Sequence, residues 1–178
     1  MIVIPDIFRE ITAEVSKEYG SRVSYMFGDS VYINETLTTW GKNPETAELK
    51  YPIIILYTPF KEEKTDYRYY CRTNLDFLIA VNAQKGYMNE DRLNISFKQV
   101  LHPIYEIFIE KVKKNSLFDF EWGFVKHIYS DNLTYGSVGA KSADVKEFND
   151  YFDGIDINKL QLTIKKEKIC YGKRLQSL

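Results

Sequence analysis

The chain has 178 residues, and its 24 basic and 25 acidic residues give a formal net charge of −1. This length suits one domain, and the charge balance argues against a general electrostatic field for nucleic acid, although a local basic patch is compatible with it. Asp6, Arg9 and Glu10 interrupt the apolar N-terminus and exclude a signal peptide, and no apolar run reaches the roughly 20 residues of a membrane helix.

The first quarter of the chain predicts a helix followed by a short hairpin. Ile4, Phe8, Ile11 and Val15 recur at helical spacing, and Gly20 is a natural stop. Residues 23–38 are rich in aromatic and β-branched side chains, so we expect a hairpin turning at residues 28–30. The polar stretch 35–49 contains glycine, asparagine and proline, and it predicts a long loop.

Two strands and a second helix are predicted in the middle of the chain. The apolar run Ile53-Ile54-Ile55-Leu56 lacks alternation, which is typical of a central strand covered on both faces. Residues 67–81 are long enough for one extended strand. From about Asn89 an apolar stripe continues at helical spacing to Val112, and we expect Pro103 to kink this helix.

The last third of the chain alternates as strands do. Aromatic residues alternate with polar ones over residues 118–124, and a second alternating run covers residues 155–164 with a change of phase, which predicts a β-bulge near Asn158-Lys159. Residues 131–150 show little periodicity and predict a second long loop. The order of elements favours a single α+β domain over residues 1–178, with a mainly antiparallel or mixed β-sheet and two helices packed on one face.

A search for catalytic and metal-binding motifs finds none of the familiar patterns, so we expect no enzyme activity, no cofactor and no metal site. The two cysteines, Cys71 and Cys170, match no zinc or redox spacing and indicate reduced thiols in a protein assembled in the cytosol. The two histidines, His102 and His127, are interpreted as structural. The alternative is a metal-dependent nuclease built from acidic residues on strands with a lysine nearby. The acidic candidates are Asp76, Asp153, Asp156 and Glu121, and the lysine is Lys126.

The C-terminal tail from about residue 165 is basic. Its lysines and Arg174 alternate with Ile169 and Tyr171. Such a tail can follow a phosphate backbone, which makes a nucleic-acid-binding module a further alternative. The simpler interpretation is a solvated edge strand, because lysines protect exposed edges from mispairing. We therefore expect contact with nucleic acid to be indirect or weak.

Several segments together resemble the tail-terminator or tail-completion proteins of tailed bacteriophages. The segments are Leu49 to Tyr57 with its Tyr-Pro-apolar start, Thr73 to Val81, the helix Phe97 to Val112, and Asp150 to Ile164. The resemblance covers nearly the whole chain but rests on arrangement and short apolar motifs. The long segments 35–49 and 131–150 depart from that family and would suit a neck or connector ring component of another tail type.

The resemblance implies a structural virion protein that forms a homo-oligomeric ring at the head–tail junction or tail end. Its partners would be copies of itself and neighbouring connector or tail proteins, without a membrane, and it would reach the virion after assembly in the host cytoplasm. Isolated apolar residues in the two long loops are our interface candidates: Leu37, Trp40, Tyr135, Val138 and Phe148. The 14 tyrosines and 11 phenylalanines suit an assembly surface or a sheet equally. The alternative for the candidates is that they fold back over the chain's own core.

Overall fold

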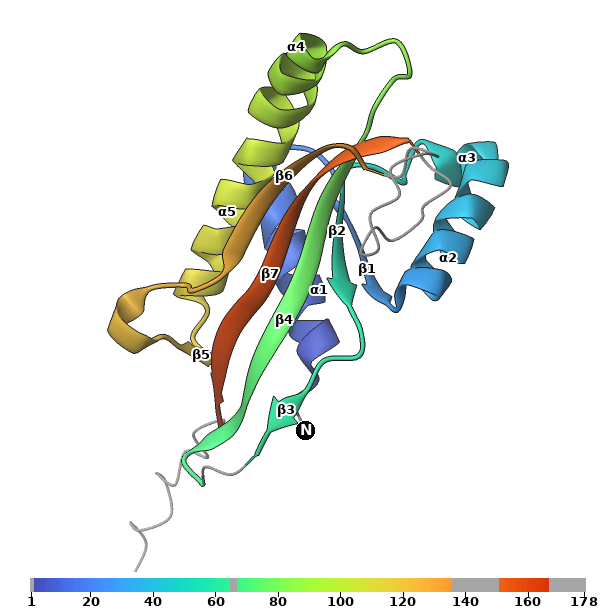
Figure 1. Ribbon diagram of the computed structural model, residues 1–178. Helices are drawn as coiled ribbons and strands as arrows, with labels where there is room; N and C mark the ends of the chain where they lie inside the picture. The colour runs from blue at the N-terminus through green and yellow to red at the C-terminus, as the bar shows by residue number, and fades with distance from the viewer. Residues whose placement is uncertain (1, 65–66, 136–150, 167–178) are drawn as a thin grey trace, which may run out of the picture.

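We describe a computed structural model over residues 2–64, 67–135 and 151–166. In these ranges the fold is a mixed sheet of seven strands with helices on both faces (Figure 1). The strands are β1 (Ser24–Gly28), β2 (Ile53–Tyr57), β3 (Glu62–Glu63), β4 (Tyr69–Asn82), β5 (Phe118–Asp119), β6 (Ile128–Tyr135) and β7 (Phe152–Lys165). The α+β fold class predicted from the sequence is confirmed.

The sheet has the order β1-β2-β4-β7-β5, so β1 and β5 lie at opposite edges. β6 also pairs with β7, and β3 pairs with β4. β1 and β2 are parallel, whereas all other pairs are antiparallel. The register of β4 against β7 shifts between Leu75 and Phe77, opposite Lys159, whose φ of 54° is left-handed. The bulge predicted at Asn158-Lys159 is therefore confirmed.

One face of the sheet is covered by α1 (Ile4–Tyr19) and by a long helix, which follows as α4 (Asn89–Asp91), the π-helical η1 (Arg92–Leu101) and α5 (His102–Lys114). The predicted apolar stripes of both helices point at the sheet. The Phe8 and Phe77 rings lie 4.6 Å apart between centroids, and Phe108 packs edge-on 5.3 Å from Phe77. At Pro103, where we expected a kink, the π-helical η1 gives way to the α-helical α5. The His102 amide still bonds to the Phe97 carbonyl, five residues earlier.

Residues 30–47 are helical, and this corrects the hairpin and the long loop expected there. α2 (Ser30–Lys42) starts at Asp29, whose carboxylate accepts a hydrogen bond from the Tyr32 amide at 2.8 Å, and α3 (Pro44–Ala47) follows. Parallel strands need a crossover connection, and α2 supplies it between β1 and β2. Its buried side chains Ile33 and Leu37 pack on the sheet face opposite α1. The helices are thus not confined to one face.

The aromatic segment 118–124 forms a much shorter strand than its alternation predicts. Only Phe118–Asp119 pairs with β7, and Phe118 is buried in the core. The chain then turns through the short 3-10 helix η2 (Glu121–Gly123), where Trp122 has a left-handed φ of 57°. Phe120 still packs partly against the core, whereas Trp122 and Phe124 are exposed.

Candidate interaction surfaces

Two of the predicted interface residues lie on the chain's own core. Leu37 is 1% exposed inside α2, and Trp40 is half-buried against the same apolar cluster, which also contains Ile55 and Leu78. Leu37 thus follows the alternative considered for it, packing on the chain's own core, whereas the interface assignment of the partly exposed Trp40 stays a prediction. The spacing of Ile33 and Leu37, one helical turn apart, was a sequence signal for a helix, but the polar composition of the segment concealed it.

The remaining candidates lie at or beyond the end of β6. Tyr135 is the last residue of this strand and pairs with Phe152 in the register of the sheet. Val138 and Phe148 lie outside the described residues, as does the basic tail after Lys166. For these positions the interface assignment stays a prediction.

A first exposed apolar surface lies at the edge formed by β1. Phe27, the last residue but one of this strand, has 40% of its area exposed, and Val31 and Tyr32 follow in the first turn of α2 at 65% and 55%. The Tyr32 ring lies directly over Gly28, where an added Cβ would come within 2.6 Å of it. We call Phe27, Val31 and Tyr32 the corner patch.

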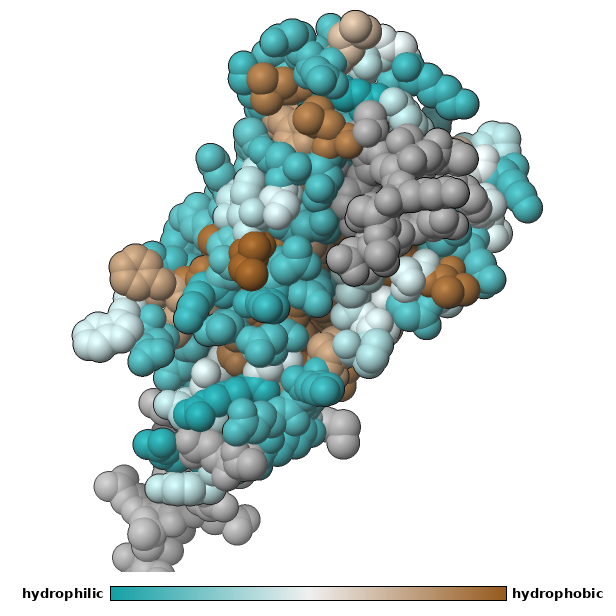
Figure 2. All heavy atoms as spheres, in the orientation of Figure 1, coloured by the Kyte–Doolittle hydropathy of each residue, from teal (hydrophilic) through white to brown (hydrophobic). Residues whose placement is uncertain are grey.

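A second exposed apolar surface lies at the opposite edge of the sheet. Trp122 is 87% exposed and Phe124 75% exposed, and Ile128 follows at the start of β6. We call these three residues the loop patch. Figure 2 shows weakly polar or apolar atoms projecting over this loop on the left flank and apolar atoms near the start of α2 on the right. Large exposed aromatic side chains of this kind are typical of surfaces that a partner covers.

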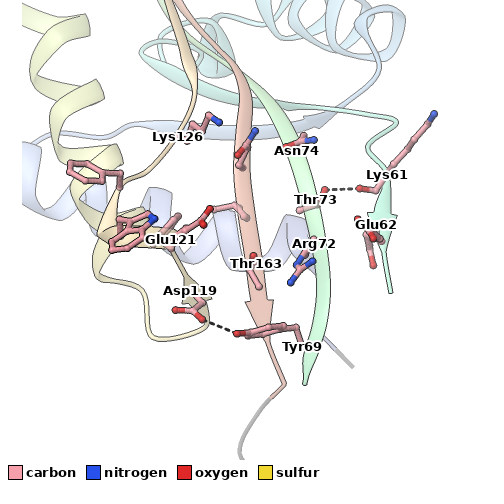
Figure 3. A pocket seen from close by; sticks show the side chains of 16 residues that line it. Lys61, Glu62, Tyr69, Arg72, Thr73, Asn74, Asp119, Glu121, Lys126 and Thr163 are labelled. Carbon is pink, nitrogen blue, oxygen red and sulfur yellow. Dashed lines mark hydrogen bonds between the residues drawn. The ribbon is translucent and has the colours of Figure 1, made fainter. Parts of the chain in front are cut away.

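Between the loop patch and β3 lies an open hollow of about 1180 Å³, which we call the polar trough (Figure 3). Its floor is the uncovered face of β4 and β7, where Arg72, Asn74, Gln161 and Thr163 stand side by side. The Tyr69 hydroxyl donates to Asp119 at 3.2 Å across its lower end. Amides, hydroxyls and charges of both signs suit a polar protein surface better than a polyanion, which selects for basic side chains.

Both histidines take part in the side-chain contacts that join α5 to β6 and the residues just before it. The His127 Nδ1 donates to the Val125 carbonyl at 2.8 Å, so in the neutral ring Nε2 accepts from the Tyr105 hydroxyl, also at 2.8 Å. Burial raises the pKa of Tyr105. This arrangement supports the structural interpretation of His127 and fixes the start of β6 against the helix.

Further side-chain contacts with α5 lie along β6. The His102 Nε2 lies 3.6 Å from the Asp131 carboxylate, and the Tyr129 hydroxyl donates to the same carboxylate. Burial first, and then the bond to Asp131, raise the pKa of Tyr129. The Tyr105 and Tyr129 rings meet edge-on with centroids 4.8 Å apart. β6 is therefore held in place at an edge of the sheet.

The three aspartates considered for a nuclease each have a structural partner. Asp76 accepts from the Lys159 amide at 2.8 Å and stabilises the bulge. Asp156 accepts from the Asn132 amide group at 2.8 Å. Asp153 is buried in an ion pair, whereas Glu121 and Lys126 line the polar trough. In the described ranges, no three His, Cys, Asp or Glu side chains come together as a metal site would need.

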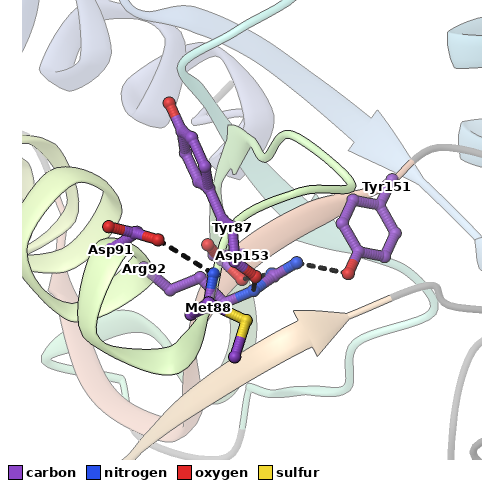
Figure 4. A network of polar contacts seen from close by, with 6 residues as sticks. All are labelled: Tyr87, Met88, Asp91, Arg92, Tyr151 and Asp153. Carbon is purple, nitrogen blue, oxygen red and sulfur yellow. Dashed lines mark hydrogen bonds and ion pairs between the residues drawn. The ribbon is translucent and has the colours of Figure 1, made fainter.

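The Asp153 ion pair joins the long helix to the start of β7 (Figure 4). The Arg92 Nη1 lies 2.5 Å from Asp153, and both side chains are at most 1% exposed. Arg92 also donates to the Tyr151 hydroxyl and, at 3.3 Å, to the Tyr87 carbonyl. Its guanidinium lies 4.7 Å from the centre of the Tyr151 ring. A buried pair of this kind fixes where β7 begins relative to the helix.

Comparisons with protein-family models, curated proteins and solved structures find no match to this chain. Among the described residues, no helix is long and apolar enough to cross a membrane.

Proposed function

We propose that this chain is a structural subunit of a homo-oligomeric ring, and that the ring belongs to the head–tail junction or tail end of a tailed bacteriophage. The observation that carries the proposal is the position of the two exposed apolar patches. The corner patch adjoins β1 and the loop patch follows β5, and these strands are the two ends of the sheet.

A closed ring needs two different, complementary surfaces on each subunit, because every joint is made by unlike patches of neighbouring copies. An isologous dimer would need only one patch. Aromatic residues at the centre of such a joint commonly supply most of its binding energy, and Trp122, Phe124 and Tyr32 are of this kind. Two separated aromatic surfaces therefore favour a ring over a dimer.

The virion role rests on the order of elements that the sequence shares with tail-terminator and tail-completion proteins. An N-terminal helix, an apolar strand after Tyr51-Pro52, a long strand, a helix and a last alternating strand occur in that order. The ring would bind neighbouring connector or tail proteins, and it would require no cofactor.

The proposal is tested by measuring the mass of the purified protein by light scattering and imaging the particles by negative-stain electron microscopy. We expect a mass several times the 20.9 kDa of one chain and ring-shaped particles. Co-purification with each structural protein encoded beside it then tests the virion role. A monomer at micromolar concentration that binds none of these proteins would contradict the proposal.

A further inference from the structure

The two edge strands of the sheet lack the basic residues and prolines that commonly prevent edge-to-edge pairing. In the described part of the chain, β1 pairs only with β2, and β6 pairs only with β7. Natural edge strands are commonly protected by lysine, proline or a covering element. Neither Ser24–Gly28 nor Ile128–Tyr135 contains a lysine, an arginine or a proline. Within the described residues, neither edge strand pairs with a second strand on its outer side.

A groove runs beside β1, between this strand and α1. It encloses about 430 Å³ and is lined by Thr12 and Ser16 of α1, by Tyr25 of β1, and by two arginines, Arg9 and Arg22. Arg9 pairs with Asp6, whereas Arg22 forms no ion pair within the ranges described. The groove therefore presents positive charge next to the open edge.

A buried polar atom also lies at this groove. The Tyr25 hydroxyl oxygen is buried and has no hydrogen-bond partner among the described residues. Burial raises the pKa of Tyr25. A buried hydroxyl without a partner is destabilising, and a polar group arriving from another chain would offset this loss. The site is thus incomplete in a single copy.

The opposite edge carries the complementary charge. Asp131 is the only charged residue of β6, and its side chain is 41% exposed. In the sheet register Asp131 stands opposite Ile155, and Tyr25 stands opposite Ile54. Ile155 and Ile54 both belong to the core under α1 and α5. Asp131 and the arginine-lined groove consequently lie on the same face of the sheet.

From these observations we infer that β6 of one copy pairs with β1 of the next, so that the sheet continues from subunit to subunit. This inference rests on the proposed ring and specifies how its joints are made. Pairing of unlike edges brings Asp131 to Arg9 and Arg22. Pairing of like edges would instead set carboxylate near carboxylate or arginine near arginine, which is unfavourable. The corner patch and the loop patch flank the two edges and would be covered by the same joint.

Disulfide crosslinking tests the pairing, because side chains of a strand alternate between faces. Phe27→Cys in β1 is combined in turn with Tyr129→Cys, Asp131→Cys and Leu133→Cys, which face the same side, in a Cys170→Ser background. Matched controls combine Phe27→Cys with Ser130→Cys or Asn132→Cys, which face the other side. We expect one same-face pair to give a ladder of crosslinked dimers, trimers and larger species on a non-reducing gel, and the controls to give monomers.

Hydrogen exchange of the unsubstituted protein provides a second measurement that needs no cysteine. Amides of residues 24–28 and 128–135 should exchange at least tenfold more slowly in the ring than in a Trp122→Ser/Phe124→Ser monomer. Rings without crosslinks and without this protection would overturn the edge pairing but leave the ring intact. Equal crosslinking by both sets of pairs would also overturn it. A protein that stays monomeric would overturn the ring and the pairing together.

Discussion

The two faces of the sheet are covered to different extents. The face under α1 and the long helix is apolar over most of its length, from Cys71 and Ile164 at one end to Ile79 and Ile155 towards the other. The opposite face is apolar only under α2, and below Leu78 it becomes the polar floor of the trough. One face therefore contributes most of the packing that holds the fold together, whereas the part of the other face below α2 contributes little to the core.

The largest effect is expected from breaking the buried ion pair at the top of the helix-covered face. Arg92→Met leaves the Asp153 carboxylate buried without its cation, and we expect the free energy of unfolding to fall by about 3–5 kcal/mol in urea denaturation. The double variant Arg92→Met/Asp153→Leu should recover most of this loss, because both charges are then removed. A single variant as stable as the parent would contradict the role assigned to Arg92.

A similar loss is expected in the middle of the same face. Phe77 packs between Phe8 and Phe108, so Phe77→Ala should cost about 3–5 kcal/mol of unfolding free energy, measured in the same way. The matched control is Gln161→Ala on the open face, which should change stability by less than about 0.5 kcal/mol. Equal losses at the two positions would remove the distinction between the faces.

The α2-covered end of the other face should tolerate substitution less well than the trough but better than the aromatic core. Leu37→Ala removes a fully buried side chain from the smaller cluster, and we expect a loss of about 2–3 kcal/mol. Glu35→Ala, at an exposed position in the same helix, serves as the control and should stay within about 0.5 kcal/mol. An unchanged stability of Leu37→Ala would restore Leu37 as an interface candidate.

Close packing between β7 and β4 predicts a smaller effect at Gly154. A Cβ there would lie 2.7 Å from the Leu78 Cδ1 and 3.2 Å from the Ile79 carbonyl oxygen. Gly154→Ala should therefore cost about 1–3 kcal/mol, since overpacking forces the leucine to shift. The double variant Gly154→Ala/Leu78→Ala should lose less than the sum of the two single changes, and strict additivity would contradict this explanation.

The helix-covered face also predicts a weak dependence of stability on alkaline pH. Burial raises the pKa of the Cys71 thiol to about 11, from an ordinary value of 9.0. In the unfolded chain this thiol loses its proton from about pH 9, whereas the folded chain retains it to about pH 11. Stability contributed by Cys71 is therefore present below pH 9 and declines between pH 9 and 11. Cys71→Ala should reduce this decline in urea denaturation at pH 8 and pH 10.5; an unchanged decline would contradict it.

How much the sequence revealed depended on whether periodicity and composition agreed. α1, β2, β4 and the stripe of the long helix were predicted because their apolar residues repeat cleanly, and the phase change at Asn158-Lys159 located the bulge. α2 was missed because only Ile33 and Leu37 are fully buried in it, and the polar residues around them resemble a loop. The strand expected over 118–124 was overextended because the left-handed Trp122 is not visible in an alternating pattern.

The candidate surfaces were less predictable than the fold. Trp122 and Phe124 continue the alternation that buries Phe118, so sequence reasoning assigned them to a strand face rather than to solvent. Leu37 and Trp40 were considered because they stood in a polar segment, yet that segment folds onto the sheet. Exposure depends on where the chain leaves the sheet, which is a tertiary property and leaves little trace in local sequence.

A mixing experiment tests the central claim, that unlike edges of neighbouring copies join head to tail. The corner variant Val31→Ser/Tyr32→Ser and the loop variant Trp122→Ser/Phe124→Ser each lack one half of every joint. Light scattering should find each variant monomeric and their equimolar mixture dimeric, because one corner patch and one loop patch remain to form a single joint. A variant that dimerises alone, or a mixture that stays monomeric while the parent forms rings, would contradict the claim.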